Sequence, residues 1–386
     1  DRQMTNAAQT LSGRQDIDVH CGRVWDFLFD LRGSANPGFV YWDSTTANLQ
    51  LPVCMDAAGW SDDPLDDDKR IAIMILTHEV AHLSGHRSES ETECVSMWAA
   101  PQTALAFGRS VNGAENGRIQ SQMGVHATDT QTPETMRAFA SAATELGNGI
   151  HMHLSQGPAE TATVERLWGK RPAEWIDDFD FYDGPVFAAH LNGADLDRDP
   201  EILRVNNATY AHNPSAGGAG GGTQPWPEML AAGVNTNIGI DTHSNDHLEN
   251  VKLAVLYGQA RYDLLAEAGR PMTRPTIWDA IRAATVNAAN GLGRSDLGRI
   301  RPGAKADLIT IDVTGLLVGS GATPPEPLNN LLYAHGRCVR DVMIDGRFQV
   351  RKGSLVVDDQ QRVVRSGGEA VSKIWGQLRN EGWFDD

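Results

Sequence analysis

The sequence predicts an α/β protein with a barrel of parallel strands, a small α+β domain before it and a β segment after it. From about residue 109, short apolar strands alternate with helical stretches, which is typical of parallel βα units. The number of these units favours a barrel over an open sheet. The first 108 residues follow a different pattern, and the last 80 or so turn to short strands. We therefore expect domains at 1–108, 109–305 and 306–386.

The first domain is expected to combine short strands with two helices. Apolar runs bounded by Gly, Pro and Asp predict strands at 39–42 and 49–53. Apolar residues at helical spacing predict a helix over 69–86. A second helix is expected from Ser88 to about Ala100.

The middle of the chain supplies the strands and helices of the expected barrel. Strands are expected over 122–125, 149–154, 186–190, 208–212 and 234–240. Helices are expected over 132–146 and 159–169. The glycine-rich stretch 217–222 is expected to be a mobile loop.

The end of the chain is expected to form a small β domain, a β-sandwich segment with a terminal helix. Strands are expected over 306–313, 339–344 and 348–350. Asp345 and Gly346 form the dipeptide of a tight hairpin turn between the last two.

Composition disfavours anionic macromolecules and anionic surfaces as partners, and a small-molecule substrate is the expected partner. The chain has 50 acidic and 33 basic residues and a formal net charge of −17. Such a surface repels phosphate backbones and anionic lipids, so we expect no nucleic-acid and no membrane partner. No apolar run approaches the length of a transmembrane helix.

Cysteine usage bears on the compartment. The four cysteines contain no CxxC pair, which excludes a cysteine-rich zinc site. Free thiols fit a cytoplasmic protein, which we favour. A Cys54–Cys94 disulfide is the alternative and would indicate an extracytoplasmic location.

A first metal site is suggested by His78-Glu79-Val80-Ala81-His82, an HExxH motif. Spacing i, i+4 on a helix puts both imidazoles on one face, where they can share Zn²⁺, and Glu79 can take a proton from zinc-bound water. Glu93 of the next helix is the best-placed third ligand, with Glu89 as the alternative or as a partner of a ligand. The competing interpretation is a surface helix without metal.

This segment resembles the short Glu-zincin metallopeptidases. The stretch HEVAHLSGHRSESETEC is similar to their HExxH helix, turn and Glu-bearing helix, and the likeness covers about residues 16–108. The resemblance implies metal ligands at His78, His82 and Glu93, with Glu79 as the base.

A second constellation lies where the barrel strands end. His153, His190, His212 and Asp241 each stand at or just after the end of a different expected strand. The carboxyl ends of barrel strands meet in one mouth, where enzymes of this architecture keep their active sites. Histidines with one aspartate suit Zn²⁺ or Fe²⁺.

This region resembles the amidohydrolase superfamily, in particular the branch of cytosine, guanine and triazine deaminases and chlorohydrolases. The likeness covers about residues 115–365. It is carried by the segments GVHATDTQTPE, HMHLSQ, AAHLNGAD, HNPSAGGAGGGTQPWPEMLAAGVNTNIGIDTHSND and DLGRIRPGAKADLITID.

The resemblance implies a metal-dependent hydrolase that attacks non-peptide C–N bonds, as in cyclic amidines or aminated heterocycles, with metal-activated water. His153 would bind the metal. Asp241 would bind it and act as general base, and His190 would steer the water or polarise the attacked carbon. The implied substrate-contacting residues are His126, Gln156 and His212.

The sequence departs from the family pattern at two places. The HxH pair of the family's first strand has no counterpart, so the first barrel strands are expected to be missing. An exposed barrel edge would favour a homo-oligomer. Gln156 stands where these deaminases carry a proton-shuttling Glu. The alternatives are a zinc metallopeptidase using the HExxH site and a composite chain with an inactive barrel.

Overall fold

The computed structural model describes residues 9, 18–22, 38–40, 46–50, 89–315, 318 and 327–380. These residues fall into two compact units. The first is drawn from segments 1–125, 130–151 and 179–184, and the second from segments 126–129, 152–178 and 185–386. The helix predicted over 69–86 lies outside the described residues.

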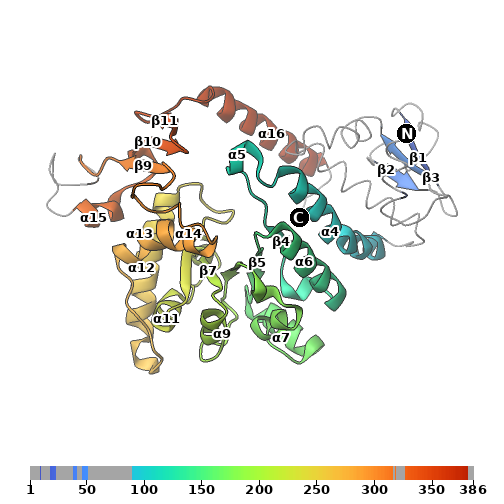
Figure 1. The fold of residues 1–386 in the computed structure, drawn as a ribbon, viewed down its shortest axis with the longest axis horizontal. Helices are drawn as coiled ribbons and strands as arrows, with labels where there is room; N and C mark the ends of the chain where they lie inside the picture. Colours follow the sequence, from blue (N-terminus) through green and yellow to red (C-terminus); the bar gives the residue numbers. More distant parts are fainter. Residues whose placement is uncertain are drawn as a thin grey trace. The chain divides into compact units, whose positions relative to one another are not determined.

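The first unit begins with a three-stranded sheet (Figure 1). Its strands, in the order β1-β3-β2, are β1 (Asp18–Gly22), β2 (Gly38–Val40) and β3 (Thr46–Gln50). β1 pairs parallel with β3, whereas β2 pairs antiparallel with it. β2 overlaps the strand predicted at 39–42. β3 begins three residues before the strand predicted at 49–53, and residues 51–53 of that prediction lie outside the described part.

Helix α4 (Glu89–Val111) is longer than predicted. It continues past residue 100 and through Pro101. A proline inside a helix lacks one backbone donor but does not always end the helix. α4 also runs across the domain boundary predicted at 108/109. The division of the chain into domains at this position stays a prediction.

Helix α6 (Pro133–Leu146) starts where the sequence predicts. The Thr132 hydroxyl accepts a hydrogen bond from the backbone N–H of Thr135, and Pro133 occupies the first turn. Both features are typical of a helix start. The short helix α5 (Ala114–Gly117) lies between α4 and α6 in the sequence.

The central sheet has five strands in the sequential order β4-β5-β6-β7-β8. They are β4 (Met123–Val125), β5 (Ile150–Leu154), β6 (Val186–His190), β7 (Thr209–His212) and β8 (Asn235–Ile238). All five were predicted, and β6–β7 and β7–β8 pair in parallel. Within the described residues β4 and β8 are the sheet edges, and a closed barrel is not shown.

Buried strands form the core of the second unit. Every residue of β6 and β7 is buried, as expected for parallel strands covered on both faces. Helices α11 and α12 both contact β8. The helices of this unit are α7 (Pro158–Trp168), α8 (Pro172–Trp175), α9 (Asp199–Val205), α10 (Pro214–Ala219), α11 (Trp226–Ala232), α12 (His247–Leu265), α13 (Ile277–Arg282), α14 (Ala288–Gly291), α15 (Pro327–Asn330) and α16 (Gln360–Asn380).

The prediction of a mobile loop over 217–222 is wrong for its first part. Residues 217–219 belong to helix α10, and Gly217 is buried. A Cβ on Gly217 would lie 2.8 Å from Cγ of Gln224, and one on Gly218 would lie 2.6 Å from Cε2 of Tyr257. These glycines therefore permit close contact with neighbouring side chains.

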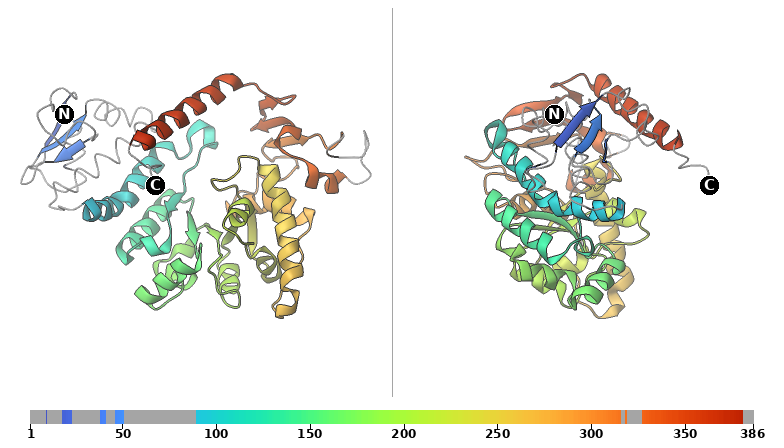
Figure 2. Two further views of the ribbon diagram at one scale, coloured as in Figure 1. Left: turned by 180° about the vertical axis from the view of Figure 1, so that it is seen from behind. Right: turned by 90° about the vertical axis from the view of Figure 1, so that its right-hand side faces the viewer.

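The end of the second unit is an antiparallel sheet followed by a long helix (Figure 2). The sheet, in the order β12-β11-β10-β9, contains β9 (Leu308–Ile311), β10 (Val339–Ile344), β11 (Arg347–Arg351) and β12 (Ser354–Leu355). The Asp345-Gly346 turn joins β10 to β11 as predicted. The described residues of this segment form one sheet, so a β-sandwich is not shown. No described helix is both long and apolar enough to cross a membrane.

Candidate active site

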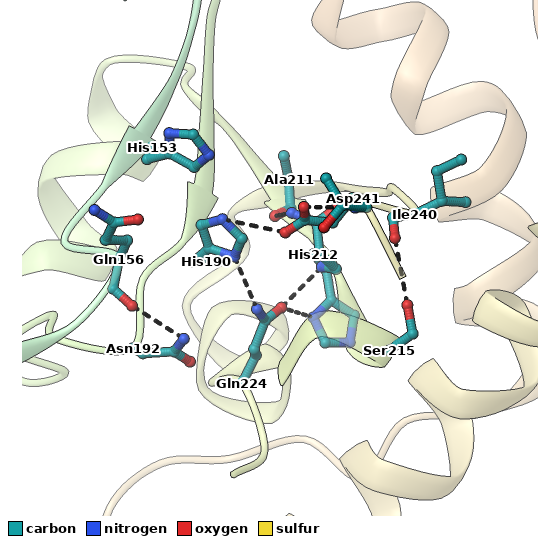
Figure 3. A network of polar contacts seen from close by, with 12 residues as sticks. His153, Gln156, His190, Asn192, Ala211, His212, Ser215, Gln224, Ile240 and Asp241 are labelled. Atoms are coloured by element: carbon teal, nitrogen blue, oxygen red, sulfur yellow. Dashed lines mark hydrogen bonds and ion pairs between the residues drawn. The ribbon is translucent and has the colours of Figure 1, made fainter. Parts of the chain in front are cut away.

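The predicted strand-end residues come together in the second unit. His153 is the next-to-last residue of strand β5, His190 ends β6, and Asp241 follows β8 by three residues. The His153 and His190 rings stack with centroids 5.1 Å apart. His190 Nε2 lies 3.6 Å from Asp241 Oδ2 (Figure 3). Parallel strands thus deliver three side chains from distant sequence positions to one place.

The backbone is strained where these side chains leave the strands. His190, Leu191 and Asp241 have φ values of 76°, 56° and 54°, and Ser155 has 46°. Non-glycine residues rarely adopt this left-handed region, and such strain concentrates at functional sites.

A backbone carbonyl orients the His153 ring. Nδ1 of His153 lies 2.7 Å from the carbonyl oxygen of His126. A carbonyl oxygen can only accept a hydrogen bond, so Nδ1 carries the proton and donates it. In the neutral ring this leaves the lone pair on Nε2, which is the form that a metal ligand requires.

His190 is buried and contacts an amide. Its Nδ1 lies 3.2 Å from Nε2 of Gln224. Burial is the main cause that lowers the pKa of His190; neighbouring His153 lowers it further, and Asp241 opposes the shift. His190 therefore favours its neutral form.

One oxygen of the Asp241 carboxylate is already engaged. The backbone N–H of Thr242 donates to Oδ1 over 2.6 Å, whereas Oδ2 faces His190. The side chain is 24% exposed, so the carboxylate remains open to a ligand.

His212 lies beneath the site and is 1% exposed. Its ring stacks on Trp226 with centroids 5.3 Å apart, and Nδ1 lies 2.9 Å from Oε1 of Gln224. Burial lowers the pKa of His212 to about 3. His212 is thus enclosed by other side chains, and its contact with the substrate stays a prediction.

The other two predicted substrate residues are more open. The His126 side chain is exposed, and its ring meets that of His153 edge to face at 5.1 Å. Gln156 is half-buried, and its backbone is held at both ends. Its N–H donates to Glu160 over 2.6 Å, and its carbonyl accepts from Asn192 over 3.1 Å.

Gly239 allows the chain to reach Asp241. Its N–H donates to the His212 carbonyl over 2.8 Å. A Cβ on Gly239 would lie 2.1 Å from Oδ1 of Asn213, so a larger residue would have to displace the Asn213 side chain.

The site supplies part of a ligand set for a divalent metal. Within the described residues no three His, Cys, Asp or Glu side chains are placed to hold a metal ion. His153 and Asp241 nevertheless provide two donors of suitable chemistry, an imidazole Nε2 lone pair and a carboxylate oxygen.

The residues predicted for the HExxH site cannot be placed. His78, Glu79 and His82 lie outside the described residues. Glu93 falls in helix α4, but its side chain, like those of Glu89 and Cys94, is outside the described part, as is Cys54.

Sequence reasoning missed Gln224. This side chain contacts both His190 and His212 and is 2% exposed. The only sequence signal was a polar residue between a glycine run and the apolar segment at 225–230.

Comparisons with known proteins agree with this geometry. The chain is 32% identical over 275 residues to a 5-methylthioadenosine/S-adenosylhomocysteine deaminase of Desulfitobacterium hafniense, covering 69% of this chain and 62% of the relative. It is 30% identical over 277 residues to a 5′-deoxyadenosine deaminase of Methanopyrus kandleri, covering 69% and 60%. The chain thus spans about three fifths of the length of these curated relatives.

Solved structures share the fold. An adenosine deaminase from Xanthomonas campestris with bound zinc has a TM-score of 0.63 at 18% identity, covering 94% of this chain and 87% of that one. Atrazine chlorohydrolase from Arthrobacter aurescens complexed with zinc has a TM-score of 0.61 at 22% identity, covering 70% and 59%.

A family model decides the relationship. The model of the amidohydrolase family matches residues 86–348, well over half of the chain. The comparisons do not show the zincin-like segment predicted over 16–108, and its last part lies inside this match. The region that resembles amidohydrolases in sequence is the one that carries His153, His190 and Asp241, and the chain belongs to the amidohydrolase family.

Proposed function

We propose that this chain catalyses the metal-dependent hydrolysis of a C–N bond in an aminated nitrogen heterocycle, with release of ammonia or an amine. The observation that carries the proposal is the convergence of His153, His190 and Asp241 from three separate strand ends. The deaminase relatives support the same reaction class.

Two side chains are proposed as part of the ligand set of the metal. His153 would bind through Nε2, and Asp241 would bind through its carboxylate. An imidazole and a carboxylate suit Zn²⁺ or Fe²⁺. When bound, such an ion supplies Lewis-acid activation of water near neutral pH.

Asp241 is proposed as the general base. The Thr242 N–H fixes Oδ1, which leaves Oδ2 to accept a proton from the attacking water. Oδ2 lies 3.6 Å from His190 Nε2. This distance is less than twice the ~2.8 Å of a typical hydrogen bond. The oxygen of the attacking water can therefore contact Asp241 Oδ2 and His190 Nε2 at once.

His190 is proposed to orient the reacting group by a hydrogen bond from its Nε2. Its ring is buried and stacks on that of His153. A buried hydrogen bond is electrostatically stronger than one in water, and the fixed ring needs little reorganisation during the reaction.

Gln156 limits the choice of substrate. The family's deaminases carry a Glu in the segment that resembles HMHLSQ. A Gln amide can hold a ring nitrogen by a hydrogen bond but cannot deliver a proton to it. We therefore propose substrates whose leaving nitrogen departs without a carboxyl proton shuttle at this position, with exposed His126 as a further contact.

The test is ammonia release from a panel of amino-substituted purines, pyrimidines and triazines by the full chain with Zn²⁺. Asp241→Asn should lower turnover by about 10²-fold or more, the usual contribution of a general base. Asp263→Asn is the matched control, because Asp263 pairs with Arg274 in a solvent-exposed contact. Full activity of Asp241→Asn would contradict the proposal.

A further inference from the structure

The Gln224 amide links the histidines that end two neighbouring strands. It lies between α10 and α11 and is 2% exposed. Its Oε1 lies 2.8 Å from the backbone nitrogen of Asn213 and 2.9 Å from Nδ1 of His212. Its Nε2 lies 3.2 Å from Nδ1 of His190 (Figure 3).

A backbone group fixes which end of the amide faces which neighbour. The Asn213 N–H can only donate, so the Gln224 atom beside it must be the oxygen. The amide nitrogen therefore faces His190. Since that nitrogen has hydrogens and no free lone pair, Nδ1 of His190 must accept. A neutral ring whose Nδ1 accepts carries its hydrogen on Nε2.

The neighbouring histidine has the opposite arrangement. The carbonyl of His126 draws the proton of His153 to Nδ1. The two stacked rings, 5.1 Å apart, thus differ in chemistry. His153 offers a lone pair at Nε2, whereas His190 offers an N–H there.

The fold makes room for the Gln224 side chain. A Cβ on Gly217 would lie 2.8 Å from its Cγ, so only glycine at 217 lets helix α10 pass this close without a shift. The Tyr210 hydroxyl, buried beside it, lies 3.3 Å from Oε1. The amide is therefore held on both sides.

We propose that Gln224 is a positioning residue that fixes His190 in its Nε2-protonated tautomer. This tautomer reserves His190 as a hydrogen-bond donor to the reacting group and keeps it out of the metal's ligand set. The donor role rests on the proposed function, whereas the tautomer does not.

The first test reads the tautomer directly. Long-range ¹H–¹⁵N NMR spectra of the full chain, labelled in its 12 histidines, distinguish protonated from bare ring nitrogens. His190→Asn identifies the His190 signals by their loss. We expect a bare Nδ1 and a protonated Nε2 on His190, with and without Zn²⁺. A protonated Nδ1 in the wild-type chain would overturn the proposal, whatever the variants do.

The variants test the role of the amide. Gln224→Glu presents an acceptor to His190 and should move its proton to Nδ1; Gln224→Met presents neither group and should leave a mixture of tautomers. Gln259→Met is the matched control, because the Gln259 amide donates to Pro275 and not to the site. An unchanged His190 tautomer in a folded Gln224→Glu would overturn the proposal.

Kinetics separate the donor role from packing. On any substrate that the wild type turns over, Gln224→Met should lower kcat about 10-fold or more with KM changed by less than about 2-fold. A change confined to KM would overturn the donor role. A wild type without turnover would overturn the proposed function and the donor role, while the spectrum would still decide the tautomer.

Discussion

Replacing His212 with Asn should remove a pH-dependent loss of stability from the second unit. His212 is 1% exposed and neutral in the folded chain, because burial lowers its pKa from an ordinary 6.5 to about 3. An Asn amide can donate to Gln224 Oε1 as His212 Nδ1 does, but it does not titrate. The substitution therefore removes the titration and keeps the donor.

The sign follows from proton binding. Below pH 6.5 the unfolded chain binds a proton at His212 that the folded chain excludes until about pH 3. The free energy of unfolding of the wild type therefore falls as pH drops from 6.5 toward 3, by about 1.4 kcal/mol per pH unit. Between pH 8 and pH 5 the His212 contribution is about 2 kcal/mol.

Urea unfolding at pH 8 and pH 5, followed by circular dichroism, measures this difference. His212→Asn should be less stable than wild type at pH 8, because the smaller side chain leaves a gap against Trp226. That deficit should shrink by about 2 kcal/mol at pH 5. Other titrating groups are shared by both proteins and cancel. A deficit of equal size at both pH values would refute a buried, neutral His212.

Two further outcomes are expected. Asp199→Ala removes the nearest of the carboxylates around the buried Arg171 guanidinium, at 2.7 Å, and leaves Glu174 at 3.2 Å and Asp195 at 3.8 Å. It should cost about 1.5–3 kcal/mol of unfolding free energy in urea, the usual range for a hydrogen bond to a charged group; a loss under about 1 kcal/mol would mean that water solvates this pair. Gln156→Glu introduces a carboxyl group that can carry a proton. It should raise kcat/KM for ring deamination, measured as ammonia release, by about 10²-fold. An unchanged kcat/KM would show that the side chain at 156 does not face the ring of the substrate.

Local patterns were sufficient to predict the central strands. Alternation of apolar runs with helical stretches located β4 to β8, and Thr132 with Pro133 located the start of α6. The convergence of His153, His190 and Asp241 followed from one rule, because parallel strands present their carboxyl ends together.

Features that depend on contacts distant in sequence were not predictable. Gly217 was interpreted as part of a loop, whereas its role is to admit Gln224. Nothing near Gln224 in the sequence indicates that Asn213 would orient its amide. The burial of His212 likewise depends on Trp226 and Tyr210 packing around its ring.

Two predictions that involve helices have different outcomes. The helix from Ser88 was expected to end near Ala100, yet α4 continues through Pro101 to Val111. The HExxH motif predicted a zinc site from spacing alone, and a five-residue pattern carries no information on whether a third ligand comes within reach. Its residues remain a prediction.

Metal content per folded chain shows whether the residues at the strand ends hold the metal. Wild type, Asp241→Ala, His153→Ala and His78→Ala would each be folded, loaded with Zn²⁺, desalted and analysed by mass spectrometry of the metal. We expect Asp241→Ala and His153→Ala to lose the bound metal and His78→Ala to keep it. Loss in His78→Ala alone would contradict the account and place the metal outside the strand-end site.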